Sequence, residues 1–213
     1  MTNQRHSGLR LLGTFLDEAR EAPPAVTSEP TTGSSTPDKV SGVPPRRLRD
    51  TFGTFDVLKN PTLRAAMDRC ISVAKGDAWC ALLAGPPGTG KTHLAVAAMH
   101  EYGLSRSFFW KVPEFLDWLR TMAYGNDTGW SIDALTKGYR TGEALVVFDD
   151  LGTENGTDWA HEQLYRVLDS RYEYELPTII TTNQPRARLD ARLLSRFDEG
   201  LVVCDGADIR RSR

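Results

Sequence analysis

Eight consecutive residues carry the most specific chemical pattern in the sequence. The pattern G-x-x-x-x-G-K-[ST] is matched by Gly85-Pro86-Pro87-Gly88-Thr89-Gly90-Lys91-Thr92. The glycines let successive backbone N–H groups turn toward phosphate oxygens. Lys91 can reach the β- and γ-phosphates, and the hydroxyl of Thr92 can bind Mg²⁺. The pattern therefore predicts a loop that binds a nucleoside triphosphate together with magnesium.

Two carboxylates follow an apolar run further along the chain. Asp149 and Asp150 come directly after residues 145–148, and Asp149 lies 58 residues after Lys91 with one predicted strand between them. Ligands of parallel α/β sheets bind at the carboxyl ends of the strands, so an acid here would meet the Mg²⁺ held by Thr92. Asp149 is the better candidate for binding the metal, because it is the first residue after the strand, and Asp150 could orient or deprotonate an attacking water. The alternative is a helix-capping or solvated acid pair.

A polar strand end and a pair of arginines complete the candidate residues. Asn183 ends the run that begins at Ile179, and its amide could hydrogen-bond the attacking water or the γ-phosphate; the alternative is strand-end capping. Arg192 and Arg196 lie on a short predicted helix. A cation from a neighbouring subunit can stabilise charge on a transferred phosphoryl group. From the residues alone, solvated arginines that pair with nearby acids are the favoured reading.

The elements that must position these residues alternate between strand and helix. Because such alternation is typical of a parallel sheet with helices on both faces, we expect an α/β fold with five strands. A helix after Thr62 precedes the first strand, and a helical insert at about 113–140, with a second short helix at 131–139, separates the second and third strands. The predicted strands are 79–84, 107–112, 144–148, 178–182 and 201–204, and the other helices are 91–102, 158–174 and 190–196.

Composition excludes several classes of protein. The net charge of the 213 residues is −2, so any DNA contact must come from a local patch. Cys70, Cys80 and Cys204 form no C-x-x-C pair, which indicates reduced thiols in a cytoplasmic protein. No apolar run approaches 18 residues, so no membrane span is expected. His93 and His100 follow the glycine-rich loop on a predicted helix and suit packing or surface positions better than metal ligation.

The first part of the chain differs from the rest. Residues 7–21 form a short amphipathic pattern, which predicts either a frayed tail or a helix that docks on a partner. Of the 24 residues at 22–45, 16 are Pro, Gly, Ser or Thr, which predicts a disordered linker that continues to residue 50 with a small basic cluster. We therefore divide the chain into a docking segment (1–21), a linker (22–50) and a folded domain (51–213).

The motifs together resemble the AAA+ ATPase domain of DnaC-type replicative helicase loaders, and the related IstB-type transposition helper ATPases share much of the pattern. The resemblance covers about residues 51–213. It is carried by the glycine-rich loop with the His93-Leu94 that follows, by Phe148-Asp-Asp-Leu-Gly-Thr-Glu154, Glu162-Gln-Leu-Tyr165, Arg171-Tyr172, Pro177-Thr-Ile-Ile-Thr-Thr-Asn183 and Arg192-Leu-Leu-Ser-Arg196.

This resemblance implies a P-loop AAA+ core of the ASCE type without a C-terminal lid domain, and it implies ATP and Mg²⁺ as ligands. It assigns Gly85–Thr92 and His93 to the nucleotide, Asp149 and Asp150 to the acidic site, and Asn183 to sensing the γ-phosphate. Arg196 matches the arginine finger that reaches a neighbouring subunit, and Arg210 matches a second sensor more loosely.

The resemblance also implies partners. These are a hexameric replicative DNA helicase, single-stranded DNA and further copies of the chain in an ATP-dependent homo-oligomer, with weak hydrolysis by the monomer. The sequence thus predicts an ATP-dependent helicase loader. The alternatives are a transposition helper ATPase that binds duplex DNA and a transposase, and a non-hydrolysing protein gated by ATP.

Overall fold

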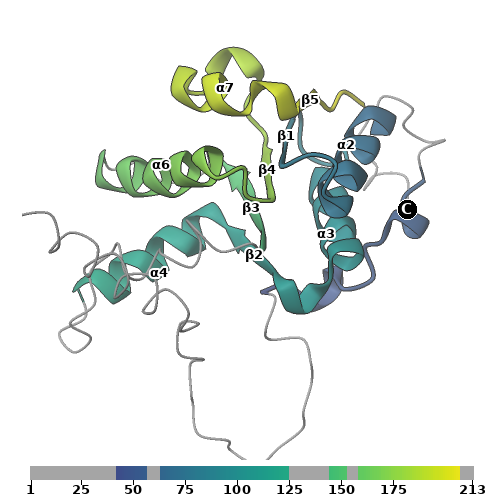
Figure 1. Cartoon of the computed structure of the whole chain (residues 1–213), viewed down its shortest axis with the longest axis horizontal. Helices are drawn as coiled ribbons and strands as arrows, with labels where there is room; N and C mark the ends of the chain where they lie inside the picture. The colour runs from purple at the N-terminus through teal and green to yellow at the C-terminus, as the bar shows by residue number, and fades with distance from the viewer. Residues whose placement is uncertain (1–41, 57–62, 125–143, 153–157, 207–213) are drawn as a thin grey trace, which may run out of the picture. The chain divides into compact units, whose positions relative to one another are not determined.

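The computed structural model describes residues 42–56, 63–124, 144–152 and 158–206 of the chain (Figure 1). The predicted docking segment 1–21, the short helix 131–139 and Arg210 lie outside these residues, so the predictions for them stay untested.

A sheet of five parallel strands forms the centre of the described domain, as the alternation predicts. The strand order is β2-β3-β4-β1-β5, so β4 lies between β1 and β3. β3 continues through both acids to Leu151 instead of ending at Phe148. The strands are β1 (Cys80–Ala84), β2 (Ser107–Lys111), β3 (Leu145–Leu151), β4 (Thr178–Thr182) and β5 (Leu201–Val203).

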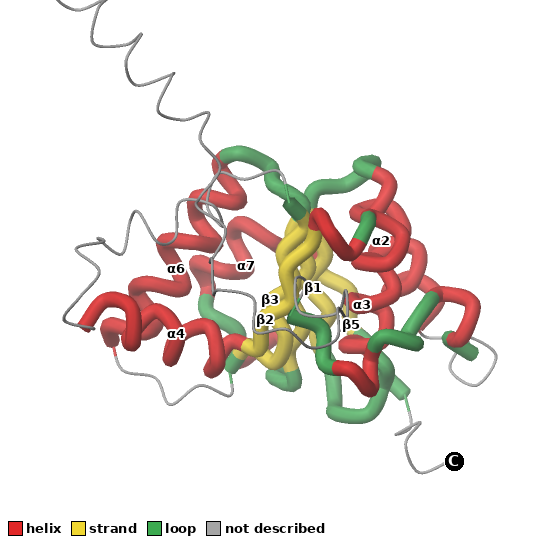
Figure 2. Tube along the Cα trace, turned by 90° about the horizontal axis from the view of Figure 1, so that it is seen from below, coloured by secondary structure: helices red, strands yellow, loops and turns green. Residues whose placement is uncertain are grey.

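Helices cover both faces of the sheet (Figures 1 and 2). Alternate residues of a strand point to opposite faces, so each strand contributes to two hydrophobic clusters. Leu83 and Val147 pack with α2 (Arg64–Lys75) and α3 (Lys91–Tyr102), whereas Leu82 and Phe148 pack on the opposite face. The helices of that second face are α4 (Val112–Tyr124), α6 (Asp158–Glu173) and α7 (Ala191–Phe197).

The folded part begins earlier than the predicted boundary at residue 51. Val43 is 3% exposed and belongs to the cluster under α2 and α3. Gly42 runs so close to β2 that a Cβ on it would lie 2.5 Å from the Phe109 carbonyl oxygen, and its φ of +73° favours glycine. Residues 42–50 therefore pack on the domain, although their Pro-rich composition predicts linker.

A buried arginine ties α6 to the starts of two strands. Arg171 is fully buried, and its guanidinium donates hydrogen bonds to Thr178 Oγ1 at 2.8 Å and to the carbonyl oxygens of Ala144 and Pro177 at 2.8 and 2.7 Å. Burial lowers the pKa of this guanidinium, but arginine keeps its proton at neutral pH. The contacts fix α6 against the amino ends of β3 and β4.

Among the described helices, none is both long and apolar enough to cross a lipid bilayer.

Candidate nucleotide-binding site

The glycine-rich loop connects the carboxyl end of β1 to the first turn of α3. At Gly85 the backbone passes so close to the end of β5 that a Cβ would lie 2.2 Å from the carbonyl oxygen of Cys204. Gly90 precedes α3 with a φ of 104°, a backbone conformation that residues with a side chain rarely adopt. The two glycines thus allow the close turn that aims the N-terminus of α3 at the loop, where the helix dipole attracts anions.

The Lys91 ammonium lies inside the loop. Its side chain is 5% exposed, and Nζ donates to the carbonyl oxygens of Gly85 and Pro86, each at 2.7 Å. Thr89, which is fully buried, closes the same turn through a hydrogen bond of 3.1 Å from its hydroxyl to Pro86. A phosphate oxygen is a charged acceptor and therefore binds this ammonium more strongly than a carbonyl does.

Thr92 and Asp149 lie side by side, as their predicted shared role requires. The Thr92 hydroxyl donates to Asp149 Oδ1 at 2.9 Å, and the Thr181 hydroxyl donates to the same oxygen at 2.7 Å. Asp149 is 7% exposed. Mg²⁺ binds through one or two carboxylate or hydroxyl oxygens of the protein together with phosphate oxygens and water, so this pair of oxygen donors fits the ion.

This fit depends on oxygens that the nucleotide would supply. Within the described residues, no group of three or more His, Cys, Asp or Glu side chains could hold a metal ion by itself. The protein groups at the site therefore suit magnesium that arrives with a triphosphate.

Asp150 adopts a backbone conformation that is rare for a residue with a side chain. Its φ is 65°, within a register shift between β3 and β4. Such conformations cost about 1–3 kcal/mol and are concentrated at functional sites. The Asp150 N–H donates to Thr181 Oγ1 at 3.0 Å, and its carboxylate accepts from Asn183 Nδ2 at 2.5 Å. The structure thus brings together the two acids and the amide.

Sequence reasoning missed the role of Thr181. Its hydroxyl accepts from the backbone of Asp150 and donates to the carboxylate of Asp149, so one side chain fixes both acids. The feature that could have indicated this role is the position of Thr181 in β4, the strand that lies between β3 and β1. Strand order could not be read from the sequence pattern alone.

His93 anchors the segment that enters the domain. Its Nε2 lies 2.9 Å from the Thr51 carbonyl oxygen, its Nδ1 lies 3.5 Å from Asp50 Oδ1, and its ring packs at 5.1 Å from that of Phe55. These contacts support the packing interpretation of His93, whereas the resemblance assigns it to the nucleotide. A reciprocal hydrogen-bond pair between Thr51 and Thr54 caps the 3₁₀ turn that presents this segment.

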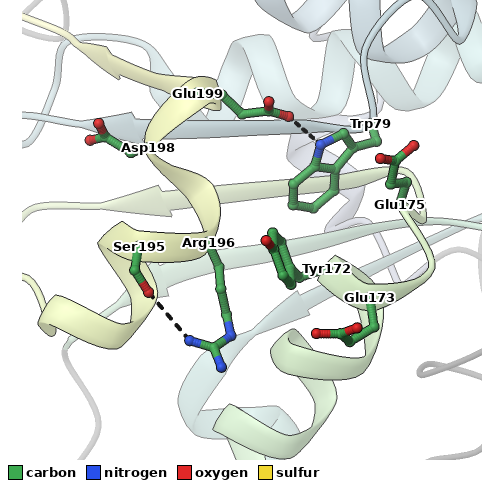
Figure 3. Close-up of a pocket in the computed structure, with 8 residues that line it drawn as sticks. All are labelled: Trp79, Tyr172, Glu173, Glu175, Ser195, Arg196, Asp198 and Glu199. Atoms are coloured by element: carbon green, nitrogen blue, oxygen red, sulfur yellow. Dashed lines mark hydrogen bonds between the residues drawn. The ribbon is translucent and has the colours of Figure 1, made fainter.

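Arg196 lies near the amino ends of the strands, whereas the loop follows the carboxyl end of β1. Arg196 lines a pocket of about 370 Å³ with Trp79, Glu175 and Glu199, which come just before β1, β4 and β5 (Figure 3). The loop instead follows the carboxyl end of β1, a strand that spans about 16 Å at 3.3 Å per residue. Arg196 therefore lies near the amino ends of the strands, away from the loop of its own chain.

The two predicted cations have different partners. Arg192 forms an ion pair of 3.1 Å with Asp190, which caps the same helix, and its hydrogen bond lowers the pKa of that carboxyl. Arg196 instead donates through Nε to Asp169 of α6. The predicted pairing with nearby acids is correct for Arg192, whereas the partner of Arg196 comes from a distant part of the chain.

All three cysteines are free thiols, and all three are buried, which the spacing did not predict. Burial raises the pKa of the Cys80 thiol to about 12 and that of Cys204 to about 11. These thiols therefore stay protonated and unreactive in the folded protein.

The sequence of the described domain matches a known family. The model of the IstB-like ATP binding protein family covers residues 69–199, the part that holds the loop, both acids and Arg196. The chain belongs to this family. The predicted resemblance to IstB-type and DnaC-type ATPases is thereby confirmed, and nucleotide binding is the property that the family name states.

Two curated relatives of this IstB-like chain come from mobile or phage-like elements. An insertion sequence ATP-binding protein of Sinorhizobium fredii is 30% identical over 151 residues, which cover 67% of this chain and 47% of the relative. The phage-like element PBSX protein XkdC of Bacillus subtilis is 32% identical over 143 residues, covering 59% of this chain and 50% of the relative. The chain thus matches about half the length of these relatives.

Solved structures confirm the AAA+ fold of the IstB-like domain. The DnaC helicase loader superimposes with a TM-score of 0.57 and 27% identity, covering 76% of this chain and 100% of that one. AMPPCP-bound DnaA from Aquifex aeolicus gives a TM-score of 0.61 at 21% identity, covering 76% and 51%. DnaI gives 0.58 at 20% identity, covering 78% and 93%.

Proposed function

We propose that this protein is an ATP-hydrolysing loader that delivers a ring-shaped, hexameric replicative DNA helicase onto single-stranded DNA in the cytoplasm. Two observations together support the proposal. The residues of a nucleotide site lie side by side, and the chain is similar to the DnaC helicase loader over the whole length of that chain at 27% identity. The proposal goes beyond the family assignment, which concerns ATP binding.

We assign hydrolysis to residues of the glycine-rich loop, of β3 and of the loop after β4. Lys91 would bind the β- and γ-phosphates, and Thr92 and Asp149 would hold Mg²⁺, whose charge offsets that of the phosphates. Asp150 would accept a proton from a water that attacks the γ-phosphate, and the hydrogen bond of 2.5 Å from the Asn183 amide would hold its carboxylate in place. The phosphoryl group passes to water, and ADP and phosphate leave.

A second copy of the chain completes this site. Arg196 lies beyond the reach of its own loop, so charge on the transferred phosphoryl group would be stabilised by Arg196 of a neighbour. Hydrolysis is then weak in the monomer, and assembly depends on ATP.

DNA contact is assigned to α4, which follows β2. Trp118 is partly buried and lies 5.6 Å from the ring of Trp110, and Arg120 of the same helix lies over the ring of Trp159 at 5.5 Å. Partly exposed aromatic rings beside a cation are a suitable platform for stacked bases and phosphates of single-stranded DNA.

A loading assay tests the proposal. The protein, ATP and the replicative helicase encoded in the same genome are incubated with closed circular single-stranded DNA, and helicase retained on the circles is measured after a high-salt wash. We expect retention that requires ATP and is lost with Lys91→Ala. Equal retention without the protein or without ATP would contradict a loading role.

A transposition helper is the second candidate, and the IstB-like family and the Sinorhizobium fredii relative favour it. It predicts ATP-dependent binding of duplex DNA in preference to single strands, and stimulation of a transposase. Competition between labelled duplex and single-stranded DNA of equal length separates the two functions. Multiple-turnover release of phosphate separates both from a protein that is only gated by ATP.

A further inference from the structure

We propose that Asp169 is the positioning residue for Arg196 and fixes its guanidinium for use by a neighbouring molecule. This inference rests on the proposed function, because it assumes that Arg196 acts in the neighbour's nucleotide site. It adds a residue on α6 that neither the motifs nor the family assignment identifies.

Three side chains of α6 hold the guanidinium of Arg196. Asp169 accepts a hydrogen bond from Nε, and the pair is partly exposed, at 27% for Arg196 and 37% for Asp169. The rings of Tyr165 and Tyr172 lie 5.1 and 5.8 Å from the central carbon of the guanidinium. One carboxylate and two aromatic rings thus restrict a side chain that would otherwise be flexible at the surface.

The contact with Asp169 uses Nε of Arg196 and leaves its two terminal nitrogens, Nη1 and Nη2, available for other partners. Nη1 makes only two long contacts of 3.3 Å, to the Arg192 carbonyl and to the Ser195 hydroxyl, the second of which Figure 3 draws. Within the described residues no hydrogen bond engages Nη2. Phosphate groups are recognised by such paired terminal N–H groups. Asp169 therefore holds Arg196 in a way that keeps its phosphate-binding edge open.

Arg192 shows the opposite arrangement on the same helix. Asp190 accepts from both Nε and Nη2 of Arg192, at 3.3 and 3.1 Å, so that fork is already occupied. The difference between the two arginines supports Arg196 as the cation that is presented outward.

Fixing Arg196 in advance has a kinetic consequence. A free arginine loses rotamer entropy when it is immobilised, and a misplacement of about 1 Å can cost on the order of 100-fold in rate. The loss of Asp169 should therefore reduce turnover in the neighbour and leave the affinity of each chain for ATP unchanged.

Mixing two inactive variants isolates this effect. The acceptor is Arg196→Ala, which retains a complete nucleotide site but lacks the arginine. The donor is Asp150→Asn, which retains the arginine but cannot activate water. Phosphate release by the acceptor with excess donor then reports how well the donor presents Arg196, and single variants alone give the background.

The test compares donors that also carry a second change. With Asp150→Asn/Asp169→Asn we expect the rate to fall by about tenfold or more at saturating ATP, with an unchanged half-saturating ATP concentration. Asp169→Glu should restore part of the rate. The matched control is Asp150→Asn/Glu173→Gln, which removes another carboxylate of α6 that lines the same pocket; among the described residues it forms no hydrogen bond or ion pair with Arg196.

The outcomes distinguish a positioning role of Asp169 from effects on folding or assembly. Sedimentation and thermal unfolding check that all donors assemble and fold alike. If the Asp169 donors match the Glu173 control, or exceed it, Asp169 does not position the arginine. If the simple donor fails to activate the acceptor at all, Arg196 serves no neighbour, and both the shared site and this inference fall.

Discussion

Thr92 at the first turn of α3 donates a hydrogen bond of 2.9 Å to Asp149 at the carboxyl end of β3. The two residues are 57 positions apart, and β4 lies between β3, which carries Asp149, and β1, which leads through the loop to Thr92. Their contact therefore depends on the order of the strands, and it places two oxygen ligands where magnesium and a triphosphate would meet.

Replacing Asp149 with Asn should uncouple magnesium from the nucleotide. We expect Mg²⁺ to tighten ATP binding by the unaltered protein but not by Asp149→Asn. Turnover should fall by about 100-fold or more, because the variant no longer holds the Mg²⁺ whose charge offsets the developing negative charge. Titration of a fluorescent ATP analogue with Mg²⁺ and with EDTA measures this. An unchanged magnesium dependence would remove Asp149 from the site.

Lys91→Ala should abolish useful ATP affinity. The ammonium lies within 2.7 Å of two loop carbonyls, and loss of its charge-assisted bonds to phosphate should weaken binding by roughly 100-fold or more. Isothermal calorimetry tests this, with Lys111→Ala as the control, because Lys111 forms an exposed ion pair with Glu114 and lies outside the loop. Equal affinity of the two variants would show that the loop is not the binding site.

Asn183→Ala should lower turnover with little change in ATP affinity. The variant leaves the Asp150 carboxylate without the hydrogen bond that orients it, and we expect a loss of about 10- to 100-fold. Single-turnover hydrolysis measures the effect. Gln184→Ala is the control, since the neighbouring amide bonds only a backbone carbonyl; if both variants slow the reaction alike, the effect of Asn183 is merely structural.

Arg171→Met should destabilise the fold by at least about 3 kcal/mol. The substitution leaves the Ala144 and Pro177 carbonyls and Thr178 buried without their charged donor. Urea unfolding measures the change against Arg166→Ala, an exposed arginine of the same helix whose pair with Glu162 contributes under about 1 kcal/mol. Similar unfolding midpoints would mean that the buried guanidinium contributes little.

The buried thiols predict a loss of stability in alkali. Because burial raises the folded pKa of Cys80 to about 12 and of Cys204 to about 11, their contribution is complete below about pH 9 and is lost as pH rises through 11 and 12. Alkylation at pH 8 should modify neither thiol until the protein unfolds, as mass spectrometry would show. Rapid labelling in native buffer would contradict their burial.

The parts of the site that the sequence predicts are those in which residue type itself carries the chemistry. Glycines, a lysine and a threonine at fixed spacing specify a phosphate loop. Apolar runs that end in Asp149 and Asn183 specify strand ends, and parallel strands place those ends at one edge. The alternation of strands and helices therefore predicted five parallel strands in nearly their observed positions.

The remaining features depend on contacts between distant residues. Val43 lies in a Pro- and Ser-rich segment, and only its contact with the core shows that the fold has begun. Thr181 bridges the two acids because β4 lies beside β3, and Asp169 reaches Arg196 because α6 packs on α7. Local composition and periodicity carry no information about such neighbours.

The loop lies at the carboxyl ends of the strands and Arg196 near their amino ends, so the molecule has two different surfaces at its two ends. If the arginine completes the next molecule's site, contacts between copies are heterologous and close into a ring or continue as a helix. A closed ring has as many working sites as molecules. An open row always has one idle loop at one end and one idle arginine at the other, so its ATP consumption per molecule rises as the row lengthens.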